Sequence, residues 1–299
     1  MCSSNEALIA TIAGIQAQVN GITSPMKSLT LKTDGPEALL DQVFTDGLFT
    51  DPHRNSALQT AEEHLAQWKS ENYDVIPIFD DRYPQQLRQI HEAPGLIFST
   101  GTIYPDDLAV SVIGSRNAGP AELKAASDVA ERLVAKGVTV VSGLAQGIDA
   151  TAHKSALRVG GRTVAVMGTG IDRTYPTEHR DLRRRIESQG GQIITQFFPG
   201  STIAKYNFPL RNATMSGYGV ATIVISASEK SGTRHQARAA IGHGRTLILT
   251  PGVVRNTSWG REYAAKGDAY VAGSPEKAVC YALEVFEKNQ NISNEFLSL

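Results

Sequence analysis

Two patterns of apolar residues alternate along the second two-thirds of the chain: short continuous runs, and residues spaced by three or four positions. The run Ala109–Ile113 is rich in Val and Ile, as is typical of a strand buried on both faces of a sheet. After Pro120, apolar residues recur on one helical face up to Gly137, a residue suited to a left-handed helix cap. Val138–Val141 is the next apolar run. The pattern predicts a strand, loop, helix and strand over residues 109–147.

The same alternation continues to residue 286. It predicts strands over Arg162–Met167, Gln192–Phe197, Val220–Ser226 and Arg245–Thr250. It predicts helices over Asp149–Val159, Thr177–Gln189, Pro209–Tyr218, Thr233–His243, Trp259–Lys266 and Pro275–Phe286. Such alternation favours an α/β fold, an extended Rossmann-like, mainly parallel sheet with helices on both faces.

Ligands of such sheets bind beyond the carboxyl ends of the strands, where the strand order reverses. The loops that follow those ends are therefore the first place to look for a site. They span residues 114–119, 142–147, 168–176, 197–208 and 226–232.

The first 72 residues carry helical patterns only. Helices are predicted within 1–20 and over 36–48 and 55–71, with a turn-rich stretch at 21–35. A strand at Asp74–Phe79 and a connector with a short helix and a further strand then lead into the sheet. We expect a small helical module at 1–72, with a scaffolding or partner-docking role, an extended Rossmann-like domain at 73–288 and a short tail at 289–299.

Composition excludes several classes of protein. The 299 residues are 41% hydrophobic and 20% charged, as in ordinary globular proteins. No apolar run approaches the roughly 18 residues of a membrane helix, and no signal pattern begins the chain. Two cysteines and seven histidines without ligand spacing indicate neither a disulfide framework nor a metal site. We expect a cytoplasmic protein that does not associate with membranes.

Charge is distributed unevenly along the chain. Residues 1–108 hold 6 Lys+Arg and 15 Asp+Glu, a net charge of −9, whereas residues 109–299 hold 23 and 15, a net charge of +8. This asymmetry suggests a polyanionic partner for the second part. The alternative is a set of basic residues spread over a solvated surface.

The loop 114–119 spaces its glycines as GxxxxG. It lacks the GxGxxG of dinucleotide folds and the Gly-Lys-Ser/Thr of a P-loop, and no acidic residue ends the following strand to hold a ribose. We therefore predict no nucleotide cofactor. What remains is a small-residue loop before a helix, suited to an anion, with Arg116 beside it. The alternative is a tight turn with a surface arginine.

Ser142, Asp149 and His153 suggest a hydrolase triad, but a nucleophile elbow has the frame GxSxG, which Ser142 lacks. A capping aspartate with a hydrogen-bonded histidine one helical turn later fits the spacing better. The run Arg183–Arg185 lies on a predicted helix, and we expect it to be a solvated face.

The segment Lys205–Asn212 contains two cations, two aromatic residues and two amides. Rings beside cations suit single-stranded nucleic acid, because bases stack on the rings while cations meet phosphates. Alternatively, Tyr206 and Phe208 anchor this loop to the core. A further anion-ready helix start follows at Ser231-Gly232. No acidic residue occurs between Lys230 and Gly260, so the helix glutamate of a phosphoribohydrolase is missing.

Together these segments resemble one family, the DNA-processing protein A (DprA, also Smf) family. The matching pieces are IGSRNAG, VVSGLAQGIDATAH, ALRVGGRTVAVMGTGIDRTYP, NFPLRN, SGTRHQAR and the TPG at 250–252, after the similar YPQQL and APGLIFSTG. They extend from about residue 83 to residue 273. The resemblance implies a non-enzymatic protein that binds single-stranded DNA, protects it during DNA uptake in natural transformation, loads a RecA-type recombinase on it and forms homodimers.

The resemblance also implies the residues of a DNA pocket. Arg116, Lys205 and Arg211 would hold phosphates, and Phe208 would pack against a base or sugar. The full predicted set is Gly114, Ser115, Arg116, Ser142, Gly143, Lys205, Phe208, Arg211, Asn212 and Gly232.

The chain departs from the family pattern at several positions. Ala213 replaces a second arginine after Arg211-Asn212, Ser226-Ala227 replaces an acidic residue, and the turn usually similar to SGSLxTA is SGTRHQAR. About a dozen residues follow Phe286, so we expect no C-terminal winged-helix domain. We therefore predict that the chain is a divergent member of the family. Two other functions stay open: a nucleotide-derivative sensor or N-glycosidic hydrolase on the same scaffold, and an interaction scaffold based on the N-terminal module.

Overall fold

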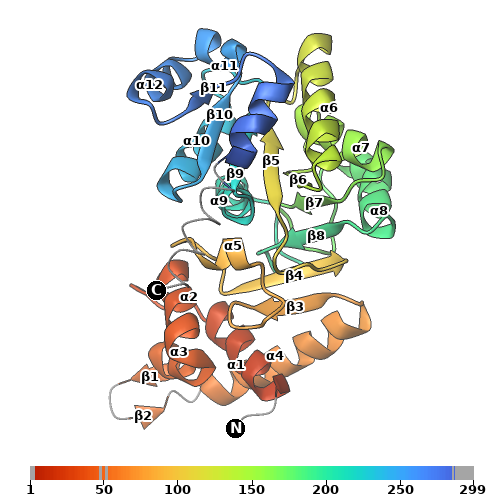
Figure 1. Cartoon of the computed structure of the whole chain (residues 1–299). Helices are drawn as coiled ribbons and strands as arrows, with labels where there is room; N and C mark the ends of the chain where they lie inside the picture. The colour runs from red at the N-terminus through yellow and green to blue at the C-terminus, as the bar shows by residue number, and fades with distance from the viewer. Residues whose placement is uncertain (1–3, 47–48, 51–52, 285, 287–299) are drawn as a thin grey trace, which may run out of the picture.

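A computed structural model of the chain describes residues 4–46, 49–50, 53–284 and 286. Its main feature is one nine-stranded sheet (Figure 1). The strands are β3 (Asp74–Pro77), β4 (Leu96–Gly101), β5 (Ala109–Ile113), β6 (Thr139–Ser142), β7 (Thr163–Val166), β8 (Gln192–Thr195), β9 (Ala221–Val224), β10 (Thr246–Leu249) and β11 (Tyr270–Val271). Their order across the sheet is β11-β10-β9-β5-β6-β7-β8-β4-β3.

The strands from β5 to β11 pair in parallel, and only β4 and β3 join the sheet through antiparallel pairs. The chain runs outward from β5 through β6, β7 and β8, and then returns to place β9 on the other side of β5. The strand order therefore reverses between β5 and β9. The predicted Rossmann-like fold is confirmed, and this reversal marks where a ligand is expected.

Helices cover both faces of the sheet (Figure 1). One face carries α6 (Pro120–Ala135), α7 (Ile148–Arg158), α8 (Arg180–Ser188) and helical residues 275–284. The other carries α9 (Asn207–Tyr218), α10 (Thr233–Gly242), α11 (Pro251–Asn256) and α12 (Ser258–Lys266). Along β5, Val110 and Val112 pack on the first group, and Ala109 and Ile113 on the second. Both faces of the strand are buried, as its uninterrupted apolar sequence predicts.

The N-terminal module consists of α1 (Ser4–Gln16), α2 (Ser24–Thr33), α3 (Gly35–Phe44) and α4 (His53–Ser70), with a two-stranded sheet of β1 (Thr45–Asp46) and β2 (Phe49–Thr50). The prediction of turns over 21–35 is wrong, because α2 occupies most of this stretch. The buried Lys27 donates hydrogen bonds to the carbonyls of Gly14 and Ile15, at 3.0 and 3.1 Å, where α1 ends. These hydrogen bonds fix α2 to the end of α1 and stabilise α2, which has few apolar residues of its own.

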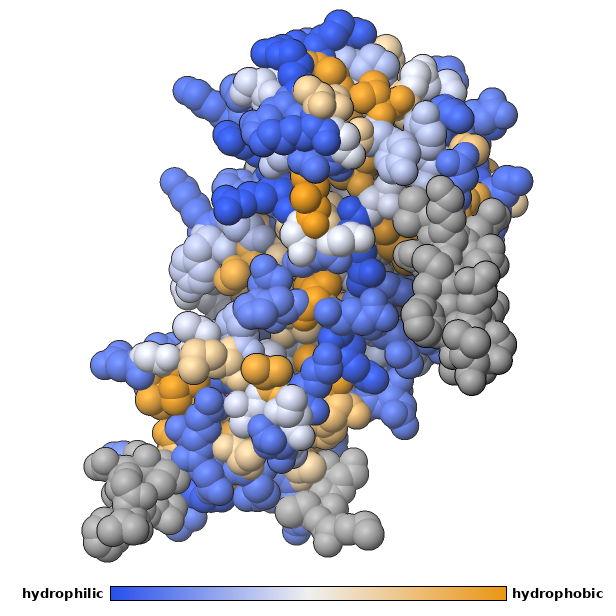
Figure 2. Space-filling model, turned by 60° about the vertical axis from the view of Figure 1, so that its left-hand side comes forward, coloured by the Kyte–Doolittle hydropathy of each residue, from blue (hydrophilic) through white to orange (hydrophobic). Residues whose placement is uncertain are grey.

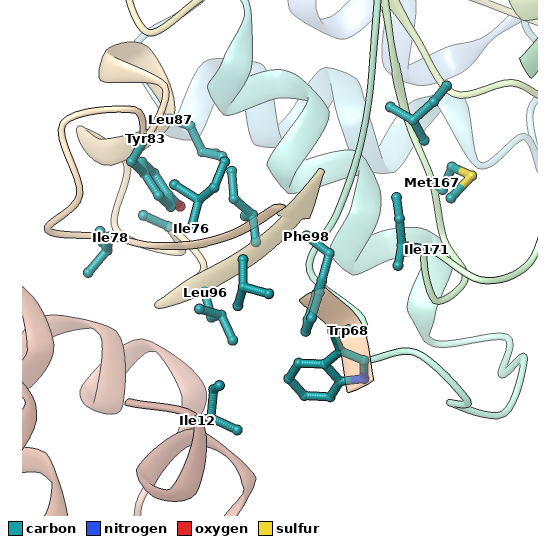
Figure 3. Packing of buried hydrophobic residues seen from close by; sticks show 14 of the residues in the cluster. Ile12, Trp68, Ile76, Ile78, Tyr83, Leu87, Leu96, Phe98, Met167 and Ile171 are labelled. Carbon is teal, nitrogen blue, oxygen red and sulfur yellow. The ribbon is translucent and has the colours of Figure 1, made fainter. Parts of the chain in front are cut away.

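A shared core joins the module to the edge of the sheet (Figure 3). Trp68 of α4 packs edge-on against Phe98 of β4, with ring centroids 4.9 Å apart. Ile12 of α1 belongs to the same hydrophobic cluster, as do Ile76 of β3 and Leu87 of the short helix α5 (Gln85–Arg88). The domain boundary predicted at residue 72 falls between α4 and β3. The two predicted domains share one core, and the division between them stays a prediction.

Most predicted elements after residue 73 match the observed ones within three residues, apart from α11 and β11, which the sequence did not predict. The first three residues of the helix predicted at 177–189 form a 3-10 turn, Thr177–His179, that leads into α8. The solvated face predicted for Arg183 is wrong, because this side chain is 13% exposed and bonds Glu187 and the carbonyl of Ile171. Arg184 and Arg185 are exposed, as predicted. Residues 47–48 and 289–299, included in the predicted helix and tail, lie outside the described residues.

The surface drawn in Figure 2 is mainly hydrophilic, with hydrophobic residues in separate patches. Within the described part of the chain, every helix is too short or too polar to cross a membrane.

Candidate nucleic-acid interface

A cavity of about 380 Å³ opens at the carboxyl ends of β5 and β9, where the strand order reverses. A second hollow of about 250 Å³ lies beside it, and Arg116, Ala145, Phe208 and Arg211 border both. The first is also lined by Ile113, Gly114, Ser115, Asn117, Asp149, Asn212, Met215, Ser228, Ser231, Gly232, Thr233 and Gln236. Asp149 is the one acidic residue among these, and it is buried.

The loop after β5 is held in place by its neighbours. The Ser115 amide donates to Ser226 Oγ at 3.3 Å, and the Ser115 carbonyl accepts from the amide of Ile148 at 3.2 Å. Gly147 has φ +74° and ψ −120°, a conformation that favours glycine. A Cβ there would lie 2.4 Å from the Ser115 carbonyl oxygen. The two loops therefore fit closely only because residue 147 has no side chain.

Arg116 and Phe208 form the wall between the two hollows. The guanidinium carbon of Arg116 lies 5.7 Å from the centroid of the Phe208 ring, within the range of a cation–π contact. On the other hollow, Tyr175 contacts the same ring at 5.8 Å between centroids. Arg116 and Tyr175 are exposed and Phe208 is half-buried. The arrangement presents a cation and two aromatic rings to solvent at one place.

Arg211 points inward from α9 and supports the floor of the site. Its Nη1 donates to the carbonyls of Gly143 at 2.6 Å and Val166 at 3.0 Å. Gly143 leaves room for it, since a Cβ there would lie 1.7 Å from Nη1. Burial raises the pKa of the Asp149 carboxyl, and the charge of Arg211 partly opposes that rise. Arg211 thus contributes a buried positive charge rather than a free surface cation.

The predicted capping role of Asp149 is wrong, because Asp149 lies inside the first turn of α7, Gly147 is the N-cap residue and no side chain caps the helix. Asp149 instead holds the loop before the helix. Its Oδ2 accepts from the amides of Gly143 at 3.1 Å and Ala145 at 3.4 Å. The proposed pairing with His153 is wrong: His153 Nδ1 donates to the hydroxyl of Thr163 at 2.7 Å. Burial lowers the pKa of His153 to about 3, so this residue is a neutral part of the core.

Ser142 has no place in a catalytic triad either. Its side chain is fully buried and donates to the carbonyl of Val112 at 2.7 Å. Ser142 lines neither of the two hollows. In the predicted DNA pocket it therefore only supports the residues that line them. Leu144 has φ +58°, and the ring of His179 donates to its carbonyl at 2.7 Å. The loop after β6 is therefore a constrained scaffold below the site.

Helices α9 and α10 together form another wall of the cavity. Asn212 Nδ2 donates to the carbonyl of Gly232, the residue before α10, at 3.3 Å. The hydroxyls of Ser231 and Thr233 lie 2.6 Å apart. The first three amides of α10 are already bonded, because Thr233 N–H donates to Ser231 Oγ at 3.1 Å and the next two donate to the carbonyls of Ser231 and Gly232. The structure therefore does not support the anion-ready helix start predicted at Ser231-Gly232.

The structure brings eight of the ten predicted residues to the two hollows: Gly114, Ser115, Arg116, Gly143, Phe208, Arg211, Asn212 and Gly232. Ser142 lies beneath them, and Lys205 is an exposed residue just before α9 that lines neither hollow. Sequence reasoning missed Tyr175 and Gln236. The turn Tyr175-Pro176 was visible in the sequence, but the contact of Tyr175 with Phe208 joins a loop to the start of α9, 33 residues further along the chain. Nothing in the sequence shows that Gln236 is buried.

Residues 74–282 match the family model described as DNA recombination-mediator protein A. This match covers more than half of the chain, and the chain therefore belongs to that family. It is 33% identical to protein Smf of Escherichia coli over 221 residues, 73% of this chain and 59% of that protein. It is 26% identical to the DNA processing protein DprA of Bacillus subtilis, over 91% of this chain and 92% of that protein.

Solved structures show the same fold. The DprA structure from Streptococcus pneumoniae superposes with a TM-score of 0.71 at 26% identity, covering 94% of this chain and 98% of that one. A Helicobacter pylori DprA structure superposes with a TM-score of 0.61 at 22% identity, covering 72% and 96%. The resemblance predicted from the sequence motifs is confirmed.

Proposed function

We propose that this protein binds single-stranded DNA at the Arg116–Phe208 wall and acts as a recombination mediator, without hydrolysing a nucleotide. The observation that carries the proposal is the exposed guanidinium held over an aromatic ring between two hollows. Aromatic rings bind bases of any sequence by stacking, and an adjacent arginine neutralises the phosphate between them.

The family membership supports the same function. The Helicobacter pylori relative was described for its single-stranded DNA binding mode, and the family is that of a DNA recombination mediator. Loading of a RecA-type recombinase, homodimer formation, a cytoplasmic location and a role in transformation complete the proposal. Strand exchange by RecA, measured with and without this protein on DNA coated with single-strand-binding protein, tests the loading step.

Binding of DNA is tested by titrating fluorescent oligo-dT, a duplex of the same length and a thymidine mononucleotide at several salt concentrations. We expect oligo-dT to bind, with an affinity that falls linearly on a log–log plot against salt. Binding of the mononucleotide without binding of oligo-dT at low salt would instead favour a nucleotide sensor.

The substitution Arg116→Ala should weaken oligo-dT binding by about tenfold and make the salt slope shallower by about 0.7, because one phosphate contact is lost. Arg132→Ala is the matched control: Arg132 is an exposed arginine in the last turn of α6, the helix that leads from the carboxyl end of β5 to the amino end of β6. It therefore lies toward the end of the strands away from the cavity. This substitution should change neither value. Equal slopes for wild type and Arg116→Ala would show that Arg116 holds no phosphate.

A further inference from the structure

The N-terminal module contacts the loop between β8 and α9, which leads to Phe208. Phe198, in this loop, is half-buried and packs against Trp68 of α4 and Phe98 of β4. The ring centroid of Phe198 lies 5.7 Å from that of Trp68 and 5.3 Å from that of Phe98. Both distances are those of favourable aromatic pairs. Since Trp68 and Phe98 also contact each other, the three rings form one aromatic cluster between the module, the sheet edge and the loop.

The same loop is attached to the loop after β7. The amide of Gly200 donates to Asp172 Oδ1 at 3.1 Å. The two backbones are in close contact at Gly170, where a Cβ would lie 2.5 Å from the Phe198 carbonyl oxygen. Ile171 is fully buried in the core that the module shares with the sheet (Figure 3). The module therefore holds both loops at one place.

From this attachment, the two loops lead to the Arg116–Phe208 wall. The loop after β7 continues to Tyr175 and the loop after β8 continues to Phe208, and the two rings contact each other at 5.8 Å. The Phe208 ring also lies on the backbone of Gly168, since a Cβ there would lie 3.1 Å from Cδ1 of the ring. Asn207 Nδ2 donates to the Gly168 carbonyl at 3.2 Å. The position of the Phe208 ring thus depends on how the two loops pack on each other.

A different set of contacts holds Arg116. Ser115, the residue before it, bonds Ser226 and Ile148, which lie in the loop after β9 and at the start of α7. A shift of the loops after β7 and β8 would therefore move the aromatic rings relative to the guanidinium, and would leave the guanidinium in place.

We propose that Phe198 is a positioning residue, through which the N-terminal module sets the place of the Tyr175 and Phe208 rings and thereby the affinity for a single strand. The inference rests on the proposed DNA binding and gives the module a part in it. Close-packed interiors transmit small displacements, and a coupling between two sites acts in both directions. Loss of the Phe198 ring therefore weakens strand binding, and a bound strand changes the surroundings of Trp68.

The first test compares Phe198→Leu and Phe198→Tyr in titrations of fluorescent oligo-dT. Leucine removes the ring contact with Trp68, and we expect about tenfold weaker binding because bases stack less well on a displaced Phe208. The salt slope should stay that of wild type, since Arg116 keeps its phosphate contact. Phe198→Tyr keeps the ring and should restore the wild-type affinity.

Leu40→Ala is the matched control for a loss of core stability. Leu40 of α3 is 1% exposed in the same hydrophobic core, and its truncation weakens the module without removing a ring from the aromatic cluster. It should bind oligo-dT like wild type at a temperature where it is folded. Equal affinities of wild type and Phe198→Leu would overturn the proposal. An equal loss of affinity in Leu40→Ala would also overturn it, because any weakening of the core would then reduce binding.

Tryptophan fluorescence provides a second readout. The chain has two tryptophans, so Trp259→Phe leaves Trp68, which lines neither hollow, as the only one. We expect saturating oligo-dT to change the emission of Trp68, and we expect Phe198→Leu in the same variant to abolish that change. A constant emission while oligo-dT binds would refute the coupling and leave the proposed DNA binding intact. Failure of wild type to bind any strand would refute both.

Discussion

Gly147→Ala is expected to destabilise the protein by about 3 kcal/mol and to weaken single-strand binding at the same time. Residue 147 has φ +74°, a conformation that costs a non-glycine residue about 1–3 kcal/mol. The added Cβ would also lie 2.4 Å from the Ser115 carbonyl oxygen and 2.6 Å from that of Arg116. Backbone atoms cannot rotate away, so the loop after β5 must move, and Arg116 moves with it.

Gly160→Ala is the matched control for this prediction. Gly160 has φ +73°, but a Cβ there would have no atom within 4 Å. It should therefore cost only the strain of the backbone, about 1 kcal/mol, and leave DNA binding unchanged. Urea unfolding and oligo-dT titration of both variants separate the two effects. If Gly147→Ala binds DNA like wild type at a temperature where it is folded, the position of the Ser115–Arg116 loop does not matter for binding.

The parallel sheet could be predicted because its signal is local and repeated. Each buried strand is a short apolar run and each crossover helix shows one apolar face, so the elements from Ala109 to Leu249 are visible in sequence. The site followed from the rule that ligands bind where strand order reverses. That rule narrowed attention to the loops that contain Arg116, Phe208 and Gly232, although the reversal itself depends on β9 pairing with β5.

What the sequence did not reveal depends on contacts between distant segments. The helix α2 has few apolar residues, and Lys27 fixes it to the end of α1. His153 stands one turn from Asp149, yet its partner Thr163 comes from the next strand. Arg211 looked like a phosphate ligand by position, but its Nη1 is used by two carbonyls. Spacing along a helix identifies neighbours on that helix, while these partners depend on the packing of the sheet.

The buried position of Arg211 leads to the other large expected effect. Arg211→Met should lower the free energy of unfolding by about 3 kcal/mol at neutral pH, because two carbonyls lose a charged donor and the ionised Asp149 loses a nearby cation. The matched control is Arg184→Met, in which the side chain lost is 76% exposed beside an exposed Asp181. That change should cost well under 1 kcal/mol.

The cost of Arg211→Met should depend on pH, in a direction set by Asp149. Burial raises the pKa of this carboxyl above its ordinary 3.8, and the charge of Arg211 opposes that rise. Without Arg211 the pKa in the folded state rises further, so the folded protein binds a proton that the unfolded chain releases. The penalty from the ionised carboxylate is then complete above the folded-state pKa and disappears as pH falls toward 3.8. Urea unfolding of wild type and Arg211→Met between pH 7.5 and about pH 4.5 measures how this penalty changes with pH. If the difference in the free energy of unfolding between the two proteins stays constant over this range, Arg211 acts only through its hydrogen bonds to Gly143 and Val166.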